Sequence, residues 1–219
     1  MIWDWEFVWE IMPALLEGLV ITVEATILGF SLAAILGLLL ALARRSESAW
    51  LSQPAGAVVE FIRSTPLLVQ LFFLFYVLPR YGIRMRPLLV GTLALGLHYG
   101  TYTSEVYRAG IEAIERGQWE AARALNFSSV HTWIRVILPQ AIPPMVPALG
   151  NYFIGMFKET PQLSAITVVE LLLTARIIGT RTFRFLEPIT MVGVLFFLLS
   201  YPSALLLQRL EARYARQNR

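Results

Sequence analysis

Residues 15–43 read LLEGLVITVEATILGFSLAAILGLLLALA, and this stretch decides the fold that the rest of the chain must fit. Its only charged residues are Glu17 and Glu24, and it is longer than the roughly 20 apolar residues that a helix needs to cross a bilayer core. Small residues recur in it at every fourth position, in line along one helix face: Ala25, Gly29, Ala33, Gly37 and Ala41. The pattern predicts a tilted membrane helix whose small-residue face packs closely against a second helix.

The composition of the whole chain also favours a membrane protein. Of the 219 residues, 57% are hydrophobic and 15% are charged, whereas about a quarter is usual in soluble domains. The net charge of +3 comes from arginines in short groups between apolar runs, a distribution typical of membrane topology rather than of a nucleic-acid-binding face. There is no cysteine, and His98 and His131 are far apart. We therefore expect a lipid bilayer as a partner, no nucleic acid, and no metal or cofactor bound by this chain.

We predict an all-α membrane protein with one transmembrane domain over residues 1–219. Five apolar runs are expected to cross the bilayer: 15–43, 57–78, 88–104 extending toward 113, 136–157 and 188–207. A polar loop over 114–135 separates the third run from the fourth, and an outer loop over 158–187 with a short helix over 168–178 separates the fourth from the fifth. The fourth run contains prolines between 139 and 147, which either bend it to shape a cavity or are only tolerated kinks.

The arginine distribution predicts the orientation. Residues 1–13, MIWDWEFVWEIMP, contain acids but no Lys or Arg, unlike a cleavable signal, and their tryptophans favour a segment at the membrane interface. Arg44 and Arg45 directly follow the first run. Placing 44–56, 108–135 and 208–219 on one side collects most of the arginines there. Five crossings then put the amino terminus outside and the carboxyl terminus in the cytoplasm.

One polar segment, QWEAARALNFSSVHTWIRVILPQ (118–140), interrupts the apolar runs. Its apolar residues lie near helical spacing, and Asn126 is suited to the left-handed conformation that ends a helix. Ser128 or Ser129 can then cap a second short helix over 131–137. The spacing therefore predicts a helix-turn-helix at the cytoplasmic surface. Spacing alone fits an amphipathic connector at the interface equally well.

The segment resembles a known motif. EAARALN (120–126), followed by ILPQAIP (137–143), is similar to the EAA loop of membrane subunits of binding-protein-dependent ABC importers. The resemblance runs in order from about Leu15 to Leu210, and its details match the polar amino-acid subfamily. Three further stretches carry it: VEFIRSTPLLVQLFFLFYVLP (59–79), EVYRAGIEAIERGQWEAARAL (105–125) and FKETPQLSAITVVELL (157–172). The FKETP variant resembles permeases for ectoine-type compatible solutes.

The resemblance implies a permease of the type I ABC importer fold whose loop is a coupling helix. It assigns coupling to seven positions: Trp119, Glu120, Ala121, Ala122, Asn126, Leu138 and Pro139. Glu120 would be the charged contact, Ala121 and Ala122 the positions of close approach, and Asn126 the turn, where the family usually has Gly. Trp119 would anchor the loop, unless it is an ordinary interfacial aromatic.

The same resemblance implies the partners. The chain has no GxxxxGK[ST] phosphate-binding loop, so it is not expected to be an enzyme, and ATP and Mg would be held by a separate cytoplasmic ATPase dimer. A second permease subunit, homologous or identical, and an extracytoplasmic solute-binding protein would complete the complex in the cytoplasmic (inner) membrane of a bacterium.

Polar side chains at membrane depth mark a candidate substrate path, because a buried charge costs about 2.5–3.5 kcal/mol on insertion scales. The candidates are Glu60, Arg63, Thr65, Lys158, Glu159 and Thr160. Lys158 could hold the carboxylate of a zwitterionic solute and Glu159 its amine, or the two could pair with each other. Glu60 and Arg63 are three residues apart and could also pair, or Arg63 could reach the boundary. The same spacing pairs Glu105 with Arg108.

These observations favour a permease subunit of an ATP-driven importer for a polar amino acid or an amino-acid-derived solute such as ectoine or hydroxyectoine. A secondary transporter or channel that needs no ATPase is the alternative. It would favour inverted repeats, and the sequence shows no internal repeat. A membrane enzyme would need a nucleophile with a base or a metal-ligand cluster at membrane depth, and no such set is apparent.

Overall fold

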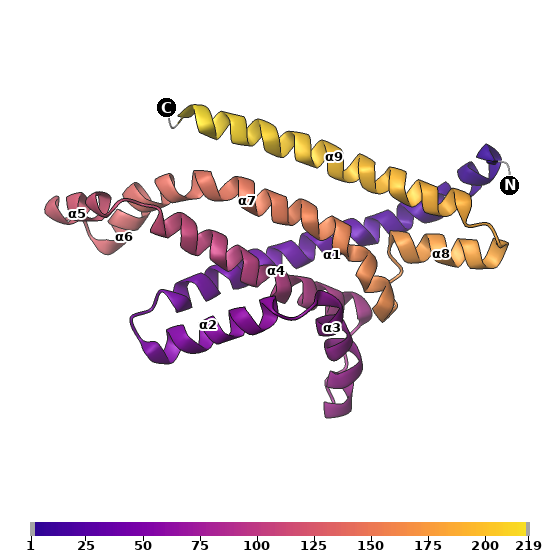
Figure 1. The fold of residues 1–219 in the computed structure, drawn as a ribbon, viewed down its shortest axis with the longest axis horizontal. Coiled ribbons are helices and arrows are strands. Elements are labelled where there is room, and N and C mark those ends of the chain that lie inside the picture. The colour runs from indigo at the N-terminus through magenta and orange to yellow at the C-terminus, as the bar shows by residue number, and fades with distance from the viewer. Residues whose placement is uncertain (1–2, 218–219) are drawn as a thin grey trace.

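The computed structural model describes residues 3–217, which fold into helices joined by short turns, without a strand. In Figure 1 the long helices run along the long axis of the molecule, and α3 projects away from them. In chain order the helices are α1 (Trp5–Arg44), α2 (Ala49–Arg63), α3 (Leu67–Phe72), α4 (Pro87–Glu112), α5 (Arg116–Ala124), α6 (Ser129–Thr132), α7 (Leu138–Glu159), α8 (Leu171–Thr182) and α9 (Leu186–Gln217). The all-α prediction is confirmed.

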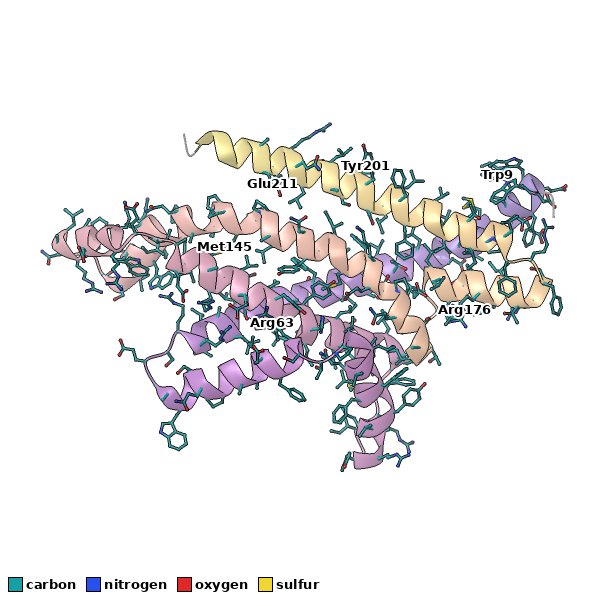
Figure 2. All side chains as sticks on the ribbon, in the orientation of Figure 1. Trp9, Arg63, Met145, Arg176, Tyr201 and Glu211 are labelled. Carbon is teal, nitrogen blue, oxygen red and sulfur yellow. The ribbon has the colours of Figure 1, made fainter. Side chains whose placement is uncertain are left out.

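The first helix is longer than the apolar run that predicts it. Its N-cap is Asp4, whose carboxylate accepts hydrogen bonds from the N–H groups of Glu6 (3.0 Å) and Phe7 (3.2 Å). The helix has 40 residues, so it extends about 60 Å, roughly twice the hydrocarbon thickness of a bilayer. The interfacial segment expected over 1–13 is therefore part of α1 from Trp5 onward, with Trp9 exposed (Figure 2). The first two residues of that segment lie outside the described residues.

The small-residue line of α1 faces α4. All five of its members are buried: Ala25, Gly29, Ala33, Gly37 and Ala41. A side chain at Gly37 would meet the backbone of Gly100 and Ser104 in α4, which shows how closely the two helices approach. The Thr103 hydroxyl of α4 donates a hydrogen bond of 2.9 Å to the Ala33 carbonyl, a direct tie between the helices. The helices α1 and α4 are therefore closely packed against each other along this line.

The run 57–78 is not one continuous helix. The chain bends by 103° between Ala49–Arg63 and Leu67–Tyr81. Pro66 causes the break, since its ring disfavours helix at the preceding residue and it lacks an N–H to continue the ladder. The Gln70 amide compensates by donating to the carbonyls of Ile62 (2.8 Å) and Thr65 (3.1 Å), which the break leaves without helical partners.

Two helices widen into a π turn directly before a Leu-Pro pair. The turns are Phe73–Val77, before Leu78, and Trp133–Ile137, before Leu138. A proline cannot donate to the carbonyl four residues earlier, and its ring crowds that carbonyl, so a wider preceding turn relieves both problems.

The later prolines of the fourth run do not break it. Pro143, Pro144 and Pro147 lie inside α7, which continues from Leu138 to Glu159. The helix is continuous through these three prolines, and a bend there that shapes a cavity stays a prediction. The helix ends only where a tighter 3₁₀ segment, Thr160–Ile166, begins at Thr160-Pro161.

The end of the molecule that carries the amino terminus is closed by α8 and the start of α9 packed on α1 (Figure 1). The short helix expected over 168–178 is α8, capped by the buried Glu170, which accepts from the N–H groups of Leu172 (2.9 Å) and Leu173 (2.8 Å). Between α8 and α9, Arg184 pairs with Asp4 at 3.1 Å and with Glu187 at 2.5 Å. The Arg184–Asp4 contact ties the turn between α8 and α9 to the start of α1.

Within residues 3–217, two helices can cross a membrane by length and composition: Trp5–Arg44 and the Leu186–Ala212 part of α9. Two bent pairs would each add a crossing if taken as one span, Ala49–Arg63 with Leu67–Tyr81 and Ser129–Ile166 with Leu171–Thr182. The five predicted runs lie mostly in helices, the second of them interrupted at residues 64–66, while the number of crossings stays a prediction.

Candidate functional site

The loop between α4 and α7 is a helix-turn-helix. Asn126 has φ of 53°, the left-handed conformation expected for it, so this part of the prediction is confirmed. Its N–H donates to the Arg123 carbonyl at 2.9 Å, and the Phe127 N–H donates to the Ala122 carbonyl at 3.0 Å. This is the Schellman pattern of helix termination. The next residue, Ser128, caps α6 by accepting from the His131 N–H at 3.3 Å.

The inner side of this loop is held by aromatic packing. The rings of Trp119 and Trp133 meet edge to face at 5.3 Å. Both pack on a small core of Ile111, Ala141 and Met145, contributed by α4 and α7 (Figure 2 labels Met145). Trp119 therefore packs on the inner side of the loop, and its role as an anchor at the interface stays a prediction.

The outer side of the loop is exposed and mixes charged and polar side chains with apolar ones. We use "loop surface" for these exposed residues: Glu120, Ala121, Leu125, Phe127, Val130 and Ile134. Ala122, by contrast, is buried beneath the turn, with 2% of its surface exposed. Leu138 is half-buried and Pro139 exposed, both in the first turn of α7. The structure thus brings Glu120 and Ala121 to the loop surface and turns Ala122 away from it.

A charged cluster joins α1, α2 and α4. Glu105 of α4 accepts from Arg44 at 2.5 Å and from Arg63 at 3.4 Å through one oxygen, and pairs with Arg108 at 2.9 Å through the other. The expected Glu105–Arg108 pair is present. The alternative pair of Glu60 with Arg63 is wrong: Arg63 reaches α4 instead, and Glu60 accepts from the Ser64 hydroxyl at 3.4 Å.

Aromatic side chains gather between α4 and α7. We use "tyrosine cluster" for Tyr99, Tyr102 and Tyr152 together with His98. The ring of Tyr152 lies 6.1 Å from that of Tyr99 and 5.6 Å from that of Tyr102, and His98 lies 5.2 Å from Tyr102. His98 is 9% exposed, and its buried Nδ1 has no hydrogen-bond partner among the described residues. A buried nitrogen without a hydrogen-bond partner is unusual, because most buried polar groups in proteins are paired.

The carboxyl of Glu159 lies beside the tyrosine cluster. It is close to the Tyr99 hydroxyl, and its buried Oε2 is unpaired within the described chain. Lys158 lies on another face of α7, exposed in a shallow hollow of about 400 Å³ beside Phe197 and Tyr201 of α9. The structure therefore does not bring Lys158 and Glu159 together around one solute, as the sequence suggested.

The two threonines of the candidate path have structural roles. The Thr160 hydroxyl is fully buried and donates to the Phe157 carbonyl at 2.7 Å. The Thr65 hydroxyl donates to the Ile62 carbonyl at 3.0 Å and accepts from Gln70 at 2.9 Å, within the α2–α3 break.

Sequence reasoning missed Gln70 and the tyrosine cluster. The three-residue spacing of Tyr99 and Tyr102 in an uncharged run is the signal that points to the cluster.

The architecture is that of a transport protein: an all-helical membrane chain with a polar cluster inside and an exposed helical loop at one end. It has the type I ABC importer permease fold, since it superposes on an amino acid ABC transporter, crystallised with histidines, with a TM-score of 0.90. That comparison covers 97% of this chain and 100% of the other at 35% sequence identity. The MetNI methionine ABC transporter in an inward-facing conformation shares the fold, with a TM-score of 0.74 over 97% of this chain and 99% of that one, at 20% identity.

The chain belongs to the family described as binding-protein-dependent transport system inner membrane component, which matches residues 33–216. A probable amino-acid ABC transporter permease, y4tG of Sinorhizobium fredii, is 48% identical over 92% of this chain and 87% of its own length. The L-cystine transport system permease TcyB of Bacillus subtilis is 37% identical over 97% and 93%. The glutamine permease GlnP of Escherichia coli is 33% identical over 96% and 97%. This protein is thus an inner-membrane permease subunit, a component that is not itself catalytic in such transporters.

Proposed function

We propose that this chain forms the membrane path of an amino-acid importer and that its α5–α6 loop couples the path to a separate ATPase. The observation that carries the proposal is the loop surface. The loop has a first helix that ends at the Asn126 turn and is anchored by Trp119, and the residues after that helix expose the large apolar side chains Leu125, Val130 and Ile134, which lipid or protein can cover. The small side chain of Ala121 permits close approach, and Glu120 supplies a charge for register.

The proposal includes the orientation and the partners. The loop surface faces the cytoplasm, the amino terminus lies outside and the carboxyl terminus inside, as the arginine distribution predicts. ATP and Mg are held by a cytoplasmic ATPase dimer. A second permease subunit, identical or homologous, provides the other half of the path, and an extracytoplasmic solute-binding protein delivers the solute.

The tyrosine cluster and Glu159 form the solute-contacting part of this chain in our proposal. Aromatic faces and an unpaired carboxylate suit the ammonium or amidinium group of a polar amino acid or a derived solute. The names of the relatives support amino acids as the class. Within that class, we propose an ectoine-type compatible solute on the FKETP stretch alone (157–161).

The test is substrate-stimulated ATP hydrolysis by the full complex in reconstituted membranes. We expect Glu120→Ala to reduce stimulation about tenfold while the complex still assembles, since losing one well-placed interfacial contact costs about 1.4 kcal/mol. Glu47→Ala is the matched control, because Glu47 is an exposed acid in the α1–α2 turn, away from the loop surface. Its stimulation should match that of the wild type.

Two results would overturn the proposal. One is transport that proceeds without any ATPase, which would favour a secondary transporter or channel. The other is an assembled complex whose stimulation is unchanged by Glu120→Ala and by Leu125→Ala together, which would make the loop an interfacial connector. The ligand that stimulates hydrolysis identifies the solute, and stimulation by common amino acids but not by ectoines would exclude the ectoine branch.

A further inference from the structure

The last residue of α2 reaches across to the tyrosine cluster. Arg63 lies at the end of α2 beside α4 (Figure 2). Its guanidinium is 5.2 Å from the ring centre of Tyr102 and 3.4 Å from Glu105. It therefore covers one face of Tyr102 on the side of the cluster nearest the loop surface. Glu105, one turn further along α4 than Tyr102, holds it there.

Glu105 is itself held in place from several directions. Arg44 at the end of α1 and Arg108 one turn along α4 bind its two oxygens, and Arg108 is steadied by Glu112 at 2.6 Å. Of the three arginines on Glu105, Arg63 makes the longest contact and is the most exposed, with 36% of its side chain accessible. Its contact is thus the one most easily released while the rest of the cluster stays intact.

The chain bends sharply directly after Arg63. Residues 64–66 separate α2 from α3 at the 103° bend, and Gln70 satisfies the carbonyls that the bend frees. Within α2, Ala55 and Val59 are the buried residues, so little packing fixes this helix to α1 and α4. A movement of α2 about residues 64–66 would carry Arg63 toward or away from Tyr102.

We propose that Arg63 is the gate residue on the loop side of the tyrosine cluster and that Glu105 is the residue that positions it. In the closed arrangement the guanidinium lies on Tyr102 and separates the cluster from the aqueous space beside α5. Release of the Arg63–Glu105 contact, with a swing of α2, opens the cluster to that space. The proposal rests on the proposed function for the location of the path.

Thiol accessibility tests the gate directly, because the natural chain has no cysteine. His98→Cys places a single thiol of this chain in the tyrosine cluster, one helical turn before Tyr102 in α4. The full complex is reconstituted in sealed vesicles, and a membrane-impermeant charged maleimide is added to one side of the membrane. That side is the one from which the same reagent labels a Glu47→Cys variant. The labelling rate of Cys at 98 is then compared among variants that all carry this change.

We expect Arg63→Gln to raise the labelling rate about tenfold, the factor by which losing a partly desolvated cation–π contact shifts a closed-to-open ratio. Glu105→Gln should raise it less, and Arg63→Lys should restore slow labelling in part, which a purely structural role would not predict. Arg84→Gln is the control, since Arg84 is exposed and has no ion pair among the described residues. Its rate should be unchanged.

An unchanged rate in Arg63→Gln, with the complex assembled, would overturn the gate. So would an equal rise in Arg84→Gln. If Arg63→Gln fails to assemble, a rate in Arg63→Lys equal to that of the parent would also reject it, since lysine cannot reproduce the planar stacking. Substrate-stimulated ATP hydrolysis, measured on the same complexes without the His98 change, separates the two proposals. Normal stimulation together with an unchanged labelling rate rejects the gate alone. Absent stimulation in the wild-type complex rejects the proposed function.

Discussion

At the scale of single residues, Asn126 shows how one side chain determines the shape of the loop. Its positive φ is required by the two hydrogen bonds that end α5, and Gly, followed by Asn and Asp, adopts this conformation at the lowest cost. The other described non-glycine residues with positive φ, Thr167 and Phe183, also end helical segments. The chain therefore places left-handed residues where a helix has to stop sharply.

Substituting Asn126 tests this dependence. Asn126→Gly should leave stability and coupling at wild-type level, whereas Asn126→Val should cost about 1–2 kcal/mol because a branched side chain is strained at positive φ. The measurements are the thermal midpoint of the purified complex and its substrate-stimulated ATP hydrolysis. Equal values for the Gly and Val variants would contradict the argument.

Asp4 gives the start of α1 a dependence of its stability on pH. The Phe7 N–H, and then the Arg184 guanidinium, hold the pKa of Asp4 below its usual value of 3.8. A carboxyl with a lowered folded-state pKa contributes stability that is present above the unfolded pKa and is lost as the pH falls through the folded one. The thermal midpoint should therefore fall below about pH 4 in the wild type and less steeply in Asp4→Asn. Parallel curves for the two proteins from pH 6 to pH 3 would rule this out.

At the scale of helices, the α1–α4 contact depends on glycine at position 37. A Cβ there would lie 2.9 Å from the Gly100 carbonyl oxygen and 3.0 Å from the Ser104 nitrogen, and backbone atoms cannot move aside as a side chain can. Gly37→Ala should destabilise the protein by about 1–3 kcal/mol through this overpacking. Gly193→Ala in α9 is the control, since a Cβ there meets nothing within 4 Å. Thermal unfolding in detergent compares them, and similar midpoints would refute the close approach.

The α2–α3 break depends on Gln70 in a similar way. Gln70→Leu should cost about 1 kcal/mol, because the part-buried carbonyls of Ile62 and Thr65 both lose the Gln70 amide as a donor, although Ile62 keeps the Thr65 hydroxyl. Gln53→Leu serves for comparison, as Gln53 is exposed on α2. Thermal midpoints decide: if the two variants unfold together, the amide of Gln70 has no part in stabilising the break.

At the scale of the whole molecule, sequence patterns predict what is local and miss what joins distant segments. The four-residue period of α1 predicts a packing face, and Asn126 followed by Ser128 predicts the turn of the loop. The bend at Pro66 is hidden in an apolar run that also fits a straight span. Arg63 binds Glu105, which lies 42 residues away in the sequence, whereas the sequence pattern favours the nearer Glu60. Tyr99 and Tyr152 look like ordinary apolar positions until α4 and α7 bring them together.

The length of α1 has a consequence for the lipid around the protein. A helix of 40 residues is about twice as long as the hydrocarbon layer it crosses, so its inclination adjusts to membrane thickness. Because α4 is fastened along α1 by backbone contacts, a change in inclination displaces the start of α4 sideways, as a lever arm does. We therefore expect acyl chain length to change the tilt of α1 and α4 together.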